Sequence, residues 1–408
     1  MNAFEVLKER GFVQQVTNEA SVSHNFSNKR LTVYVGFDPT AESLHIGNLL
    51  CLMALAHTQR AGHRTIAIIG DGTALVGDPS GKTEMRPILA RDKIASNAER
   101  IKSQIAKFID IDGERGIAVH NATWLVHLKY IDFLREIGRH FSVNRMLAAE
   151  AYKARLKTGL SFLEFNYQLL QAYDFLMLNR DYDCTIQMGG DDQWGNILAG
   201  VDLIRRVERK EADGITWPLI TTSGGQKMGK TASGALWLDA AKTSPYEYYQ
   251  YWINVHDDDV RRFLACFTFL PMGEIADLTN KQGAELRTAK EALAFEATKI
   301  AHGVAEADRA RAASQSAFGG KAHNMAAIPS TILKTADLEG GLLVVDLFER
   351  VGLAPSKSGA RRLIEQGGAY VNENRITSID ATVDLSSLQN EMLVLRAGKK
   401  RYHRVLLR

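Results

Sequence analysis

Short runs of apolar and β-branched residues alternate over residues 31–222 with longer stretches in which apolar positions recur at helical spacing. The short runs predict buried strands, and the longer stretches predict helices. We expect strands at 31–35, 65–70, 116–121, 184–189 and 217–222, and helices near 47–60, around 92–109 and from about 192. Because apolar strands separated by helices are typical of a parallel sheet covered on both faces, the pattern predicts an α/β fold.

The pattern changes in the other parts of the chain. Residues 125–183 are predicted to be a helical insertion, and their apolar aromatic residues suit a dimer surface. Residues 245–316 are predicted to be helical throughout. The predicted division of the chain is 1–222 for the α/β domain, 223–316 for a loop and a helical domain, 317–341 for an Ala/Gly/Ser-rich linker, and 342–408 for a small α+β domain.

The composition is that of an ordinary globular protein, with 45% hydrophobic and 24% charged residues among 408. The net charge of +3 is small, but it is unevenly distributed. Residues 342–408 contain eleven Lys and Arg against seven Asp and Glu, which leaves the rest of the chain at −1. A basic C-terminal part on a nearly neutral body predicts a module that binds a polyanion.

The cysteines and the N-terminus indicate a reducing compartment. Cys51, Cys184 and Cys266 are far apart in the chain and form no C-x-x-C pair, which argues against a disulfide framework or a zinc site. The first twelve residues predict an amphipathic helix with charges of both signs, unlike a signal or transit peptide. We therefore expect a cytoplasmic protein without a membrane span or a protein-held metal ion.

Residues 224–231, GGQKMGKT, match the phosphate-loop pattern G-x-x-x-x-G-K-[ST]. A phosphate loop opens a helix, whose N-terminus holds the phosphates. Here Gly234 interrupts any first turn, an extended ALWL run follows, and no helical stripe is present before Pro245. The phosphate-loop reading is therefore disfavoured. What remains is a glycine-flanked loop whose Lys227 and Lys230 can bring positive charge to a polyphosphate.

Residues 34–49, YVGFDPTAESLHIGNL, leave the first predicted strand and enter a helix at the edge where open α/β sheets bind ligands. Gly36 and Gly47 have no side chain, so a flat base can lie against the backbone there. His45 and Asn48 are three positions apart at the helix start, where both can donate hydrogen bonds to phosphate oxygens. A lone histidine at this position would more often belong to a capped helix with no ligand.

Residues 167–175, YQLLQAYDF, form a polar stripe in apolar surroundings. Tyr167, Gln171 and Asp174 span about 60° of one helix face, and no Lys, Arg or Glu occurs between residues 165 and 179. Buried polar groups need partners. We favour a ligand site here over an internal hydrogen-bond network.

These stretches together resemble a known family. DPTAESLHIGN resembles the first signature motif of class I aminoacyl-tRNA synthetases, and KMGKT resembles the second. GGDDQWGN and YQLLQAYDF resemble the bacterial tyrosyl-tRNA synthetases in particular. The motifs occur in order between about residues 30 and 255. The resemblance implies a Rossmann-like catalytic domain, an all-helical domain and a homodimer.

The resemblance also implies roles for individual residues. Contacts to the phosphates of ATP and the leaving pyrophosphate are expected from Thr40, His45, Asn48, Lys82, Arg86, Lys227 and Lys230. Adenine and ribose are expected to lie among Gly36, Asp38, Gly47, Gly189 and Asp192. Tyrosine is expected to be held by Tyr34 and Asp174 at its hydroxyl and by Asp78, Tyr167 and Gln171 at its ammonium, with Gln187 and Gln193 close by. Two departures from the family pattern are Asn48 in place of a second histidine and Gly229 in place of serine.

The C-terminal stretch SKSGARRLIEQGGAYVN, residues 356–372, resembles the ribosomal-protein-S-four-type RNA-binding domain. The resemblance implies contacts to tRNA phosphates from Lys357, Arg361, Arg362, Lys399, Lys400 and Arg401. Such contacts position an RNA more than they identify it.

The implied reaction joins L-tyrosine to ATP, which enters with Mg²⁺, and then transfers the tyrosyl group to the 3′-terminal ribose of tRNA(Tyr). No Ser-His-Asp or Cys-His arrangement is evident, and none is needed, because an α-carboxylate with a pKa of about 3.5 is already ionised. Three alternatives remain at this point: a phosphate-loop NTPase, a non-catalytic RNA-binding protein on the same scaffold, and a tryptophanyl-tRNA synthetase. Tyr34 with Asp174, and the appended RNA module, favour tyrosine.

Overall fold

The computed structural model describes residues 2–80, 84, 86–223, 225, 228, 230–231, 234–280, 283–318, 328–389, 391–398 and 401–407. Four predicted site residues lie outside these ranges, namely Lys82, Lys227, Lys399 and Lys400, as does Gly229. Within the described part of the chain, no helix combines the length and apolar character that crossing a bilayer requires.

A seven-stranded sheet forms the centre of the first compact unit, which comprises 1–229, 237–239 and 256–281. Its strands, in spatial order, are β1 (Gln15–Val16), β7 (Asp213–Trp217), β6 (Cys184–Gly190), β2 (Thr32–Phe37), β3 (Arg64–Ile69), β5 (Gly116–His120) and β4 (Asp112–Gly113). The five central strands pair in parallel, and the two short edge strands pair antiparallel. The α/β fold is confirmed.

The prediction of a strand at 217–222 was wrong. The strand is β7, and it ends at Trp217, where the prediction began. Pro218 follows and has no N–H to continue the ladder, so an apolar run after it is not a central strand. The edge strands β1 and β4 have only two residues each and leave no periodic signal.

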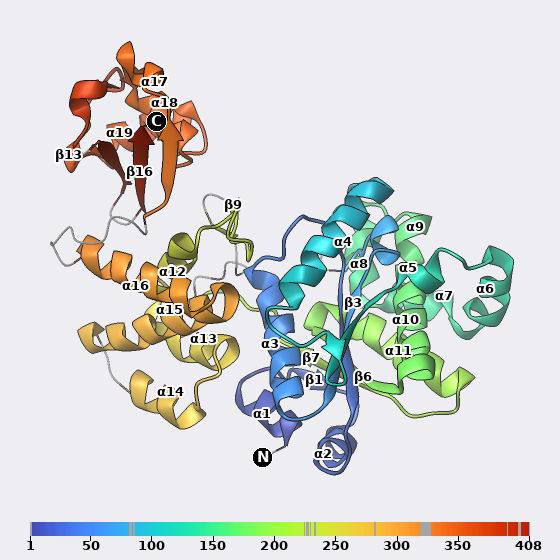
Figure 1. The fold of residues 1–408 in the computed structure, drawn as a ribbon. Coiled ribbons are helices and arrows are strands. Elements are labelled where there is room, and N and C mark those ends of the chain that lie inside the picture. Colours follow the sequence, from blue (N-terminus) through green and yellow to red (C-terminus); the bar gives the residue numbers. More distant parts are fainter. Residues whose placement is uncertain are drawn as a thin grey trace. The chain divides into compact units, whose positions relative to one another are not determined.

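Helices cover both faces of this sheet. Figure 1 shows α3 (Ile46–Arg60) and α4 (Arg91–Ile105) on one side, and α10 (Tyr167–Tyr182) and α11 (Trp194–Val207) on the other. Apolar residues of β2 and β3 pack against Phe175 and Leu176 of α10. The segment between β5 and β6 is helical, as predicted, with α5 (Ala122–Leu125), α6 (Tyr130–Glu136), α7 (Val143–Ala148), α8 (Glu150–Thr158) and α9 (Phe162–Phe165) before α10.

The predicted helical stretch 245–316 is helical, but its helices divide between the two compact units. In the first unit lie α13 (Val260–Phe267) and α14 (Met272–Thr279); in the second lie α12 (Pro245–Ile253), α15 (Arg287–His302) and α16 (Val304–Phe318). The Arg10 guanidinium explains the position of α13. It donates to the carbonyls of Ala265, Thr268 and Leu270 at distances of 2.9, 3.1 and 2.6 Å, and so caps the C-terminal end of α13. A single helical domain at 223–316 was therefore wrong.

The C-terminal part is an α+β domain, as predicted. Its sheet has the order β10 (Ser330–Leu333), β16 (Arg401–Leu407), β15 (Met392–Ala397), β12 (Ala369–Val371) and β13 (Asn374–Arg375). The helices are α17 (Ala336–Glu339), α18 (Val344–Arg350) and α19 (Lys357–Glu365), and β11 (Leu342–Leu343) pairs with β14 (Thr382–Val383). Leu333 and Leu338 belong to the core of this domain. The predicted linker therefore extended too far, because residues 330–339 form β10 and α17.

Candidate active site

A cavity of about 380 Å³ opens at the carboxyl ends of the parallel strands, at the edge predicted from the sequence. The predicted site residues that line it are Tyr34, Gly36, Asp38, Thr40, His45, Gly47, Asn48, Asp78, Arg86, Tyr167, Gln171, Asp174, Gln187, Gly189, Asp192 and Gln193. The separate stretches of the sequence therefore meet in one place.

Asp174 and Tyr34 lie on the buried wall of this cavity. The Asp174 carboxylate is 3% exposed and accepts hydrogen bonds from Trp124 Nε1 at 2.7 Å and Asn121 Nδ2 at 2.9 Å. Burial raises the pKa of Asp174 to about 7 even though these hydrogen bonds lower it. The Tyr34 hydroxyl is buried and has no hydrogen-bond partner among the described residues. Burial, and then the charge of Asp174, raise the pKa of Tyr34 well above its usual value.

This pair of groups fits a ligand hydroxyl. A phenol can accept a hydrogen bond from Tyr34 and donate one to Asp174. Because a buried hydroxyl without a partner costs free energy, such a ligand would satisfy a group that has no partner among the described residues.

Asn121 connects this wall to the neighbouring loops. Its Oδ1 accepts from the backbone N–H of Gly72 at 2.8 Å, and its Nδ2 also donates to Thr73 Oγ1 at 3.0 Å. Thr73 Oγ1 in turn donates to Asp38 Oδ1 at 2.7 Å, and the Tyr167 hydroxyl donates to Asp38 Oδ2 at 2.8 Å. The pKa of Asp38 is raised to about 6, chiefly by burial. The polar stripe on α10 is thus partly an internal network, with Asp38 as its acceptor.

Hydrogen-bond acceptors predominate on the next part of the wall. Asp78 Oδ1 accepts from the backbone N–H of Ser80 and Oδ2 from Gln193 Nε2, both at 2.9 Å. Gln171 Oε1 accepts from Asn196 Nδ2 at 3.0 Å. Gln187 Oε1 is buried without a hydrogen-bond partner in the described part of the chain. Carboxylate, amide and phenol oxygens that converge in this way suit an ammonium group, which only donates.

The mouth of the cavity is formed by the N-terminus of α3. His45 is the N-cap residue, and its Nδ1 accepts from the Gly47 N–H at 3.0 Å, so in the neutral ring Nε2 carries the hydrogen. Asn48 Oδ1 accepts from the His45 N–H at 3.1 Å, which leaves the amide hydrogens as donors. A Cβ at Gly47 would lie 2.7 Å from the His45 ring, whereas a Cβ at Gly36 would meet nothing within 4 Å. Glycine is therefore needed at 47 for the cap, and Gly36 leaves its wall flat.

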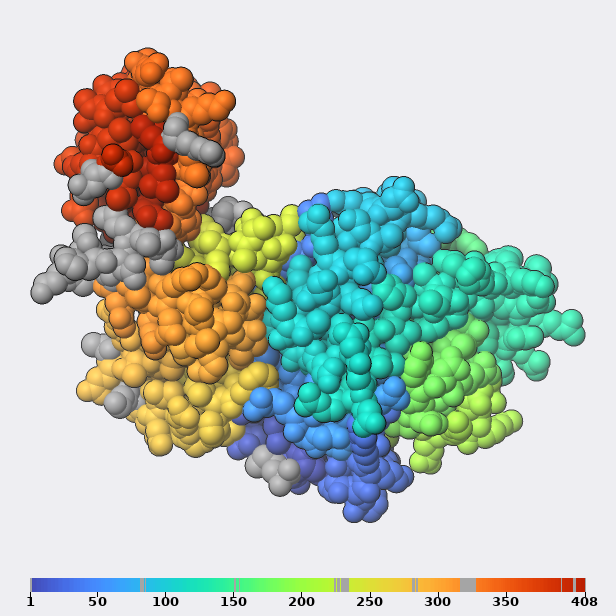
Figure 2. All heavy atoms as spheres, viewed as in Figure 1, coloured from blue at the N-terminus to red at the C-terminus, as the bar shows by residue number. Residues whose placement is uncertain are grey.

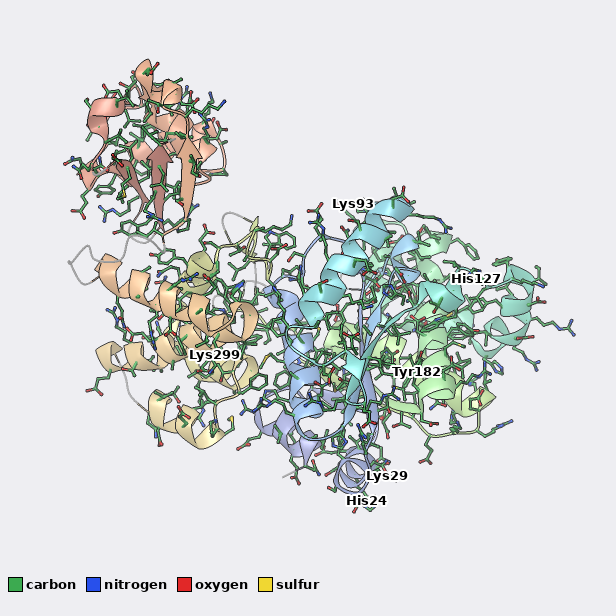
Figure 3. All side chains as sticks on the ribbon, in the orientation of Figure 1. His24, Lys29, Lys93, His127, Tyr182 and Lys299 are labelled. Carbon is green, nitrogen blue, oxygen red and sulfur yellow. The ribbon has the colours of Figure 1, made fainter. Side chains whose placement is uncertain are left out.

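Helix α4 holds the loop that leads to His45. Gln104 Oε1 accepts from the Leu44 N–H at 2.9 Å and from Ser43 Oγ at 3.1 Å. Asn97 Nδ2 donates to the carbonyl of Pro39 at 3.1 Å. Lys93, labelled on α4 in Figure 3, forms an ion pair with Glu42 of the same loop. The donors at the mouth are therefore positioned by a neighbouring helix.

The loop of the second signature motif is described only in part. Lys230 and Thr231 form β8, which pairs antiparallel with β9 (Gly234–Ala235). A phosphate loop would open a helix here, so the phosphate-loop alternative is contradicted. Arg86 lines the cavity and donates from Nε to the carbonyl of Asp78 at 3.0 Å. In the described ranges, no group of three or more His, Cys, Asp and Glu side chains is placed to hold a metal ion.

The C-terminal basic residues lie on different elements. Lys357, Arg361 and Arg362 are on α19, and Lys357 pairs with Asp346 at 2.9 Å. Arg401 donates to the carbonyls of Gly352 and Leu353 at 2.8 and 3.0 Å, which is an internal structural role. Its predicted contact to phosphate must therefore compete with these hydrogen bonds.

Two residues that orient Asp174, Asn121 and Trp124, were not predicted from the sequence. Asn121 ends the strand predicted at 116–121 and Trp124 comes three residues later, and parallel strands bring their carboxyl ends to one edge. Their position at the carboxyl end of a predicted strand could have indicated that they belong to the site. This inference also required knowing that β5 lies next to β3 in the sheet.

Comparisons with known proteins find similarity to tyrosine–tRNA ligases along the whole chain. Residues 26–319 match the family described as tRNA synthetases class I (W and Y), and residues 323–405 match the tyrosine–tRNA ligase SYY-like C-terminal domain. The chain is 53% identical over 426 residues to the tyrosine–tRNA ligase of Desulfatibacillum aliphaticivorans, covering 100% of this chain and 99% of the relative. It is 51% identical over 407 residues to that of Clostridium botulinum strain 657, covering 100% of both.

Solved structures give the same picture. The C-terminally truncated mitochondrial tyrosyl-tRNA synthetase of Aspergillus nidulans matches with a TM-score of 0.70 and 31% identity, over 78% of this chain and 94% of that chain. A tryptophanyl-tRNA synthetase from Encephalitozoon cuniculi shares only the fold, at 13% identity and a TM-score of 0.56, over 75% of this chain and 87% of that chain. The tryptophanyl alternative is therefore not supported.

Proposed function

The chain belongs to the tyrosine–tRNA ligases of class I, and from this premise we propose that the cavity at the carboxyl ends of the strands holds tyrosine and ATP side by side. The family ligates tyrosine to tRNA and uses ATP. The roles of the individual residues are part of this proposal.

The buried hydroxyl of Tyr34, which lies beside Asp174 and has no hydrogen-bond partner in the described part of the chain, supports the assignment of the tyrosine pocket. The phenol of tyrosine hydrogen-bonds to both groups, whereas phenylalanine leaves the buried Tyr34 hydroxyl without a partner and gives Asp174 no donor beyond Trp124 and Asn121. Tyrosyl-tRNA synthetases are the standard example of this kind of rejection. The ammonium of tyrosine then lies among the oxygens of Asp78, Tyr167 and Gln171, which places its carboxylate toward the mouth.

The first step needs positioned donors more than a base. An oxygen of the ionised tyrosine carboxylate forms a bond to the α-phosphorus of ATP, and the bond from that phosphorus to pyrophosphate breaks. His45 Nε2–H and the Asn48 amide donate to phosphate oxygens as negative charge increases on them. Donors that fit the five-coordinate phosphorus better than bound ATP accelerate the step. We expect Mg²⁺ to enter as its complex with ATP, coordinated largely by phosphate oxygens.

In the second step, a hydroxyl of the 3′-terminal ribose of tRNA(Tyr) attacks the tyrosyl carbonyl and AMP leaves. The basic residues of α19 support binding of the tRNA phosphates by the C-terminal domain. Removal of this domain is expected to weaken tRNA charging and to leave adenylate formation intact. Free cysteines at 51, 184 and 266 support a cytoplasmic location.

A homodimer is supported by the helical segment between β5 and β6. Its exposed apolar side chains are Val126, Tyr130, Ile131, Val143, Leu156, Phe162 and Leu163. In Figure 2 the teal region of the sequence, which includes much of this segment, lies on the outer surface. We propose that these apolar side chains, which all come from one helical segment, form the contact between two copies of the chain.

ATP–pyrophosphate exchange, measured with each of the twenty amino acids in turn, tests the proposal. We expect exchange with tyrosine and a much lower rate with phenylalanine and tryptophan. ATP hydrolysis without any amino acid, or exchange that does not depend on tyrosine, would contradict it.

A further inference from the structure

Two tyrosines and an arginine lie in one row across the sheet of the C-terminal domain. The strand registers place Tyr370 of β12 opposite Arg396 of β15, and Arg396 opposite Tyr402 of β16. The guanidinium carbon of Arg396 is 3.7 Å from the ring centre of Tyr370 and 5.9 Å from that of Tyr402. These distances are those of cation–π contacts.

This row is on the face of the sheet away from the helices. The alternate residues Val371 and Leu395 are buried in the core with Phe348 of α18 and Ile364 of α19. Because successive side chains in a strand point to opposite faces, Tyr370, Arg396 and Tyr402 point away from that core. All three are half-buried, so no element of the domain covers them fully.

The charge on this sheet has a single sign. None of its five described strands contains an Asp or Glu, while β13, β15 and β16 contribute Arg375, Arg396, Arg401 and Arg404. Arg404 follows Tyr402 on the same face, next to Val394 of β15. Arg401 points to the opposite face, where it donates to the carbonyls of Gly352 and Leu353. The open face therefore presents aromatic rings and the guanidinium groups of Arg375, Arg396 and Arg404, without a carboxylate from the strands.

We propose that this open face binds unpaired nucleotides of the tRNA, whose bases stack on the row formed by Tyr370, Arg396 and Tyr402. Aromatic rings and guanidinium planes are what proteins use to stack splayed-out bases, and positive charge attracts the backbone. A base-paired stem would offer phosphates but no free base face. A second copy of the same face would repel through its arginines. The proposal rests on the tRNA being the substrate, and adds a contact distinct from the basic residues of α19.

Binding of tRNA(Tyr) to the full-length chain, measured at several salt concentrations, tests this proposal. Tyr370→Ala and Tyr402→Ala are each expected to weaken binding by roughly 5- to 150-fold, which corresponds to the loss of one stacked base. The slope of log affinity against log salt should not change, because no phosphate contact is lost. Tyr370→Phe and Tyr402→Phe keep the ring and should bind like the parent chain.

Two further measurements separate this proposal from others. Arg396→Gln should weaken binding and also reduce the salt slope, by up to about one. Tyrosine-dependent pyrophosphate exchange should remain unchanged in every variant, because the residues that line the cavity belong to the other compact unit. Failure of this exchange in the parent chain would instead overturn the proposed function. Thermal unfolding checks that the alanine variants remain folded. Parental tRNA affinity in the folded double alanine variant, or equal losses in the Phe and Ala variants, would overturn the stacking proposal.

Discussion

The indole Nε1 of Trp124 donates a hydrogen bond of 2.7 Å to Asp174 Oδ1, although the two residues are fifty positions apart in the chain. Trp124 is on α5 and Asp174 is on α10. With Asn121 on the other oxygen, the indole holds the carboxylate in one orientation, and the remaining lone pairs are left for a ligand.

Trp124→Phe removes this hydrogen bond and keeps most of the ring. Because hydrogen bonds to charged groups contribute about 1.5–3 kcal/mol, we expect the KM for tyrosine in pyrophosphate exchange to rise roughly tenfold or more. The KM for ATP should change little, since the phosphates lie at the other end of the cavity. An unchanged KM for tyrosine would show that Asp174 needs no help from the indole.

Tyr34→Phe removes the buried hydroxyl that has no partner in the described chain. In the absence of tyrosine, the free energy of unfolding should rise by about 1 kcal/mol, while the KM for tyrosine rises and the preference over phenylalanine falls. Tyr152→Phe is the matched control. Its hydroxyl donates to the carbonyl of Phe165 at 3.0 Å, so its removal should destabilise the fold by a similar amount. If denaturant unfolding shows that both variants are stabilised or that both are destabilised, the conclusion that the Tyr34 hydroxyl has no partner in the absence of tyrosine is contradicted.

The free energy of unfolding of Asp174→Asn, relative to that of the parent chain, should increase as the pH rises. Burial raises the pKa of Asp174 to about 7, above its unfolded value of about 3.9, so the folded chain binds more protons between these values. The parent therefore loses stability as the pH rises through this window, by up to about 4 kcal/mol for this group. Unfolding of both proteins at pH 5 and pH 8, without tyrosine, checks this. A stability difference that is the same at both pH values would be inconsistent with a buried carboxyl of raised pKa.

Asn48→Asp separates the two functions of the Asn48 side chain. It keeps an oxygen for the His45 N–H but loses the amide donor, so stability should change by less than about 1 kcal/mol while the rate of adenylate formation falls about 100-fold. Asn48→Ala loses the cap as well, and should be about 1 kcal/mol less stable. Single-turnover adenylate formation and thermal unfolding measure the two effects. A parental rate in Asn48→Asp would show that the amide does not act on the phosphates.

Phe162→Asp tests the proposed homodimer surface. The Phe162 side chain is 69% exposed, and a charge there should shift the protein toward monomers in analytical ultracentrifugation. Ile88→Asp is the control, because Ile88 is apolar and 67% exposed but lies outside the helical segment. If both variants sediment like the parent chain, the contact lies elsewhere.

Short-range relationships were within reach of the sequence alone. His45 and Asn48 are three positions apart, so one helix start brings them together, and Tyr167, Gln171 and Asp174 share one face because the helix period is local. The apolar runs placed four of the five parallel strands for the same reason. The order of the motifs along the chain then indicated the family, although the residues of these motifs come together only in the folded chain.

Tertiary structure decided which groups complete these local units. The donors to Asp174 come from Trp124 of α5 and from Asn121 just before this helix, because β5 lies next to β3 in the sheet. Arg10 caps the C-terminal end of α13 by donating to Ala265, which is 255 positions away in the chain. The end of the predicted linker depends on the packing of Leu333 and Leu338 in the core of the C-terminal domain. Such partners are selected by strand order and by burial, which are properties of the whole chain, and no local periodicity records them.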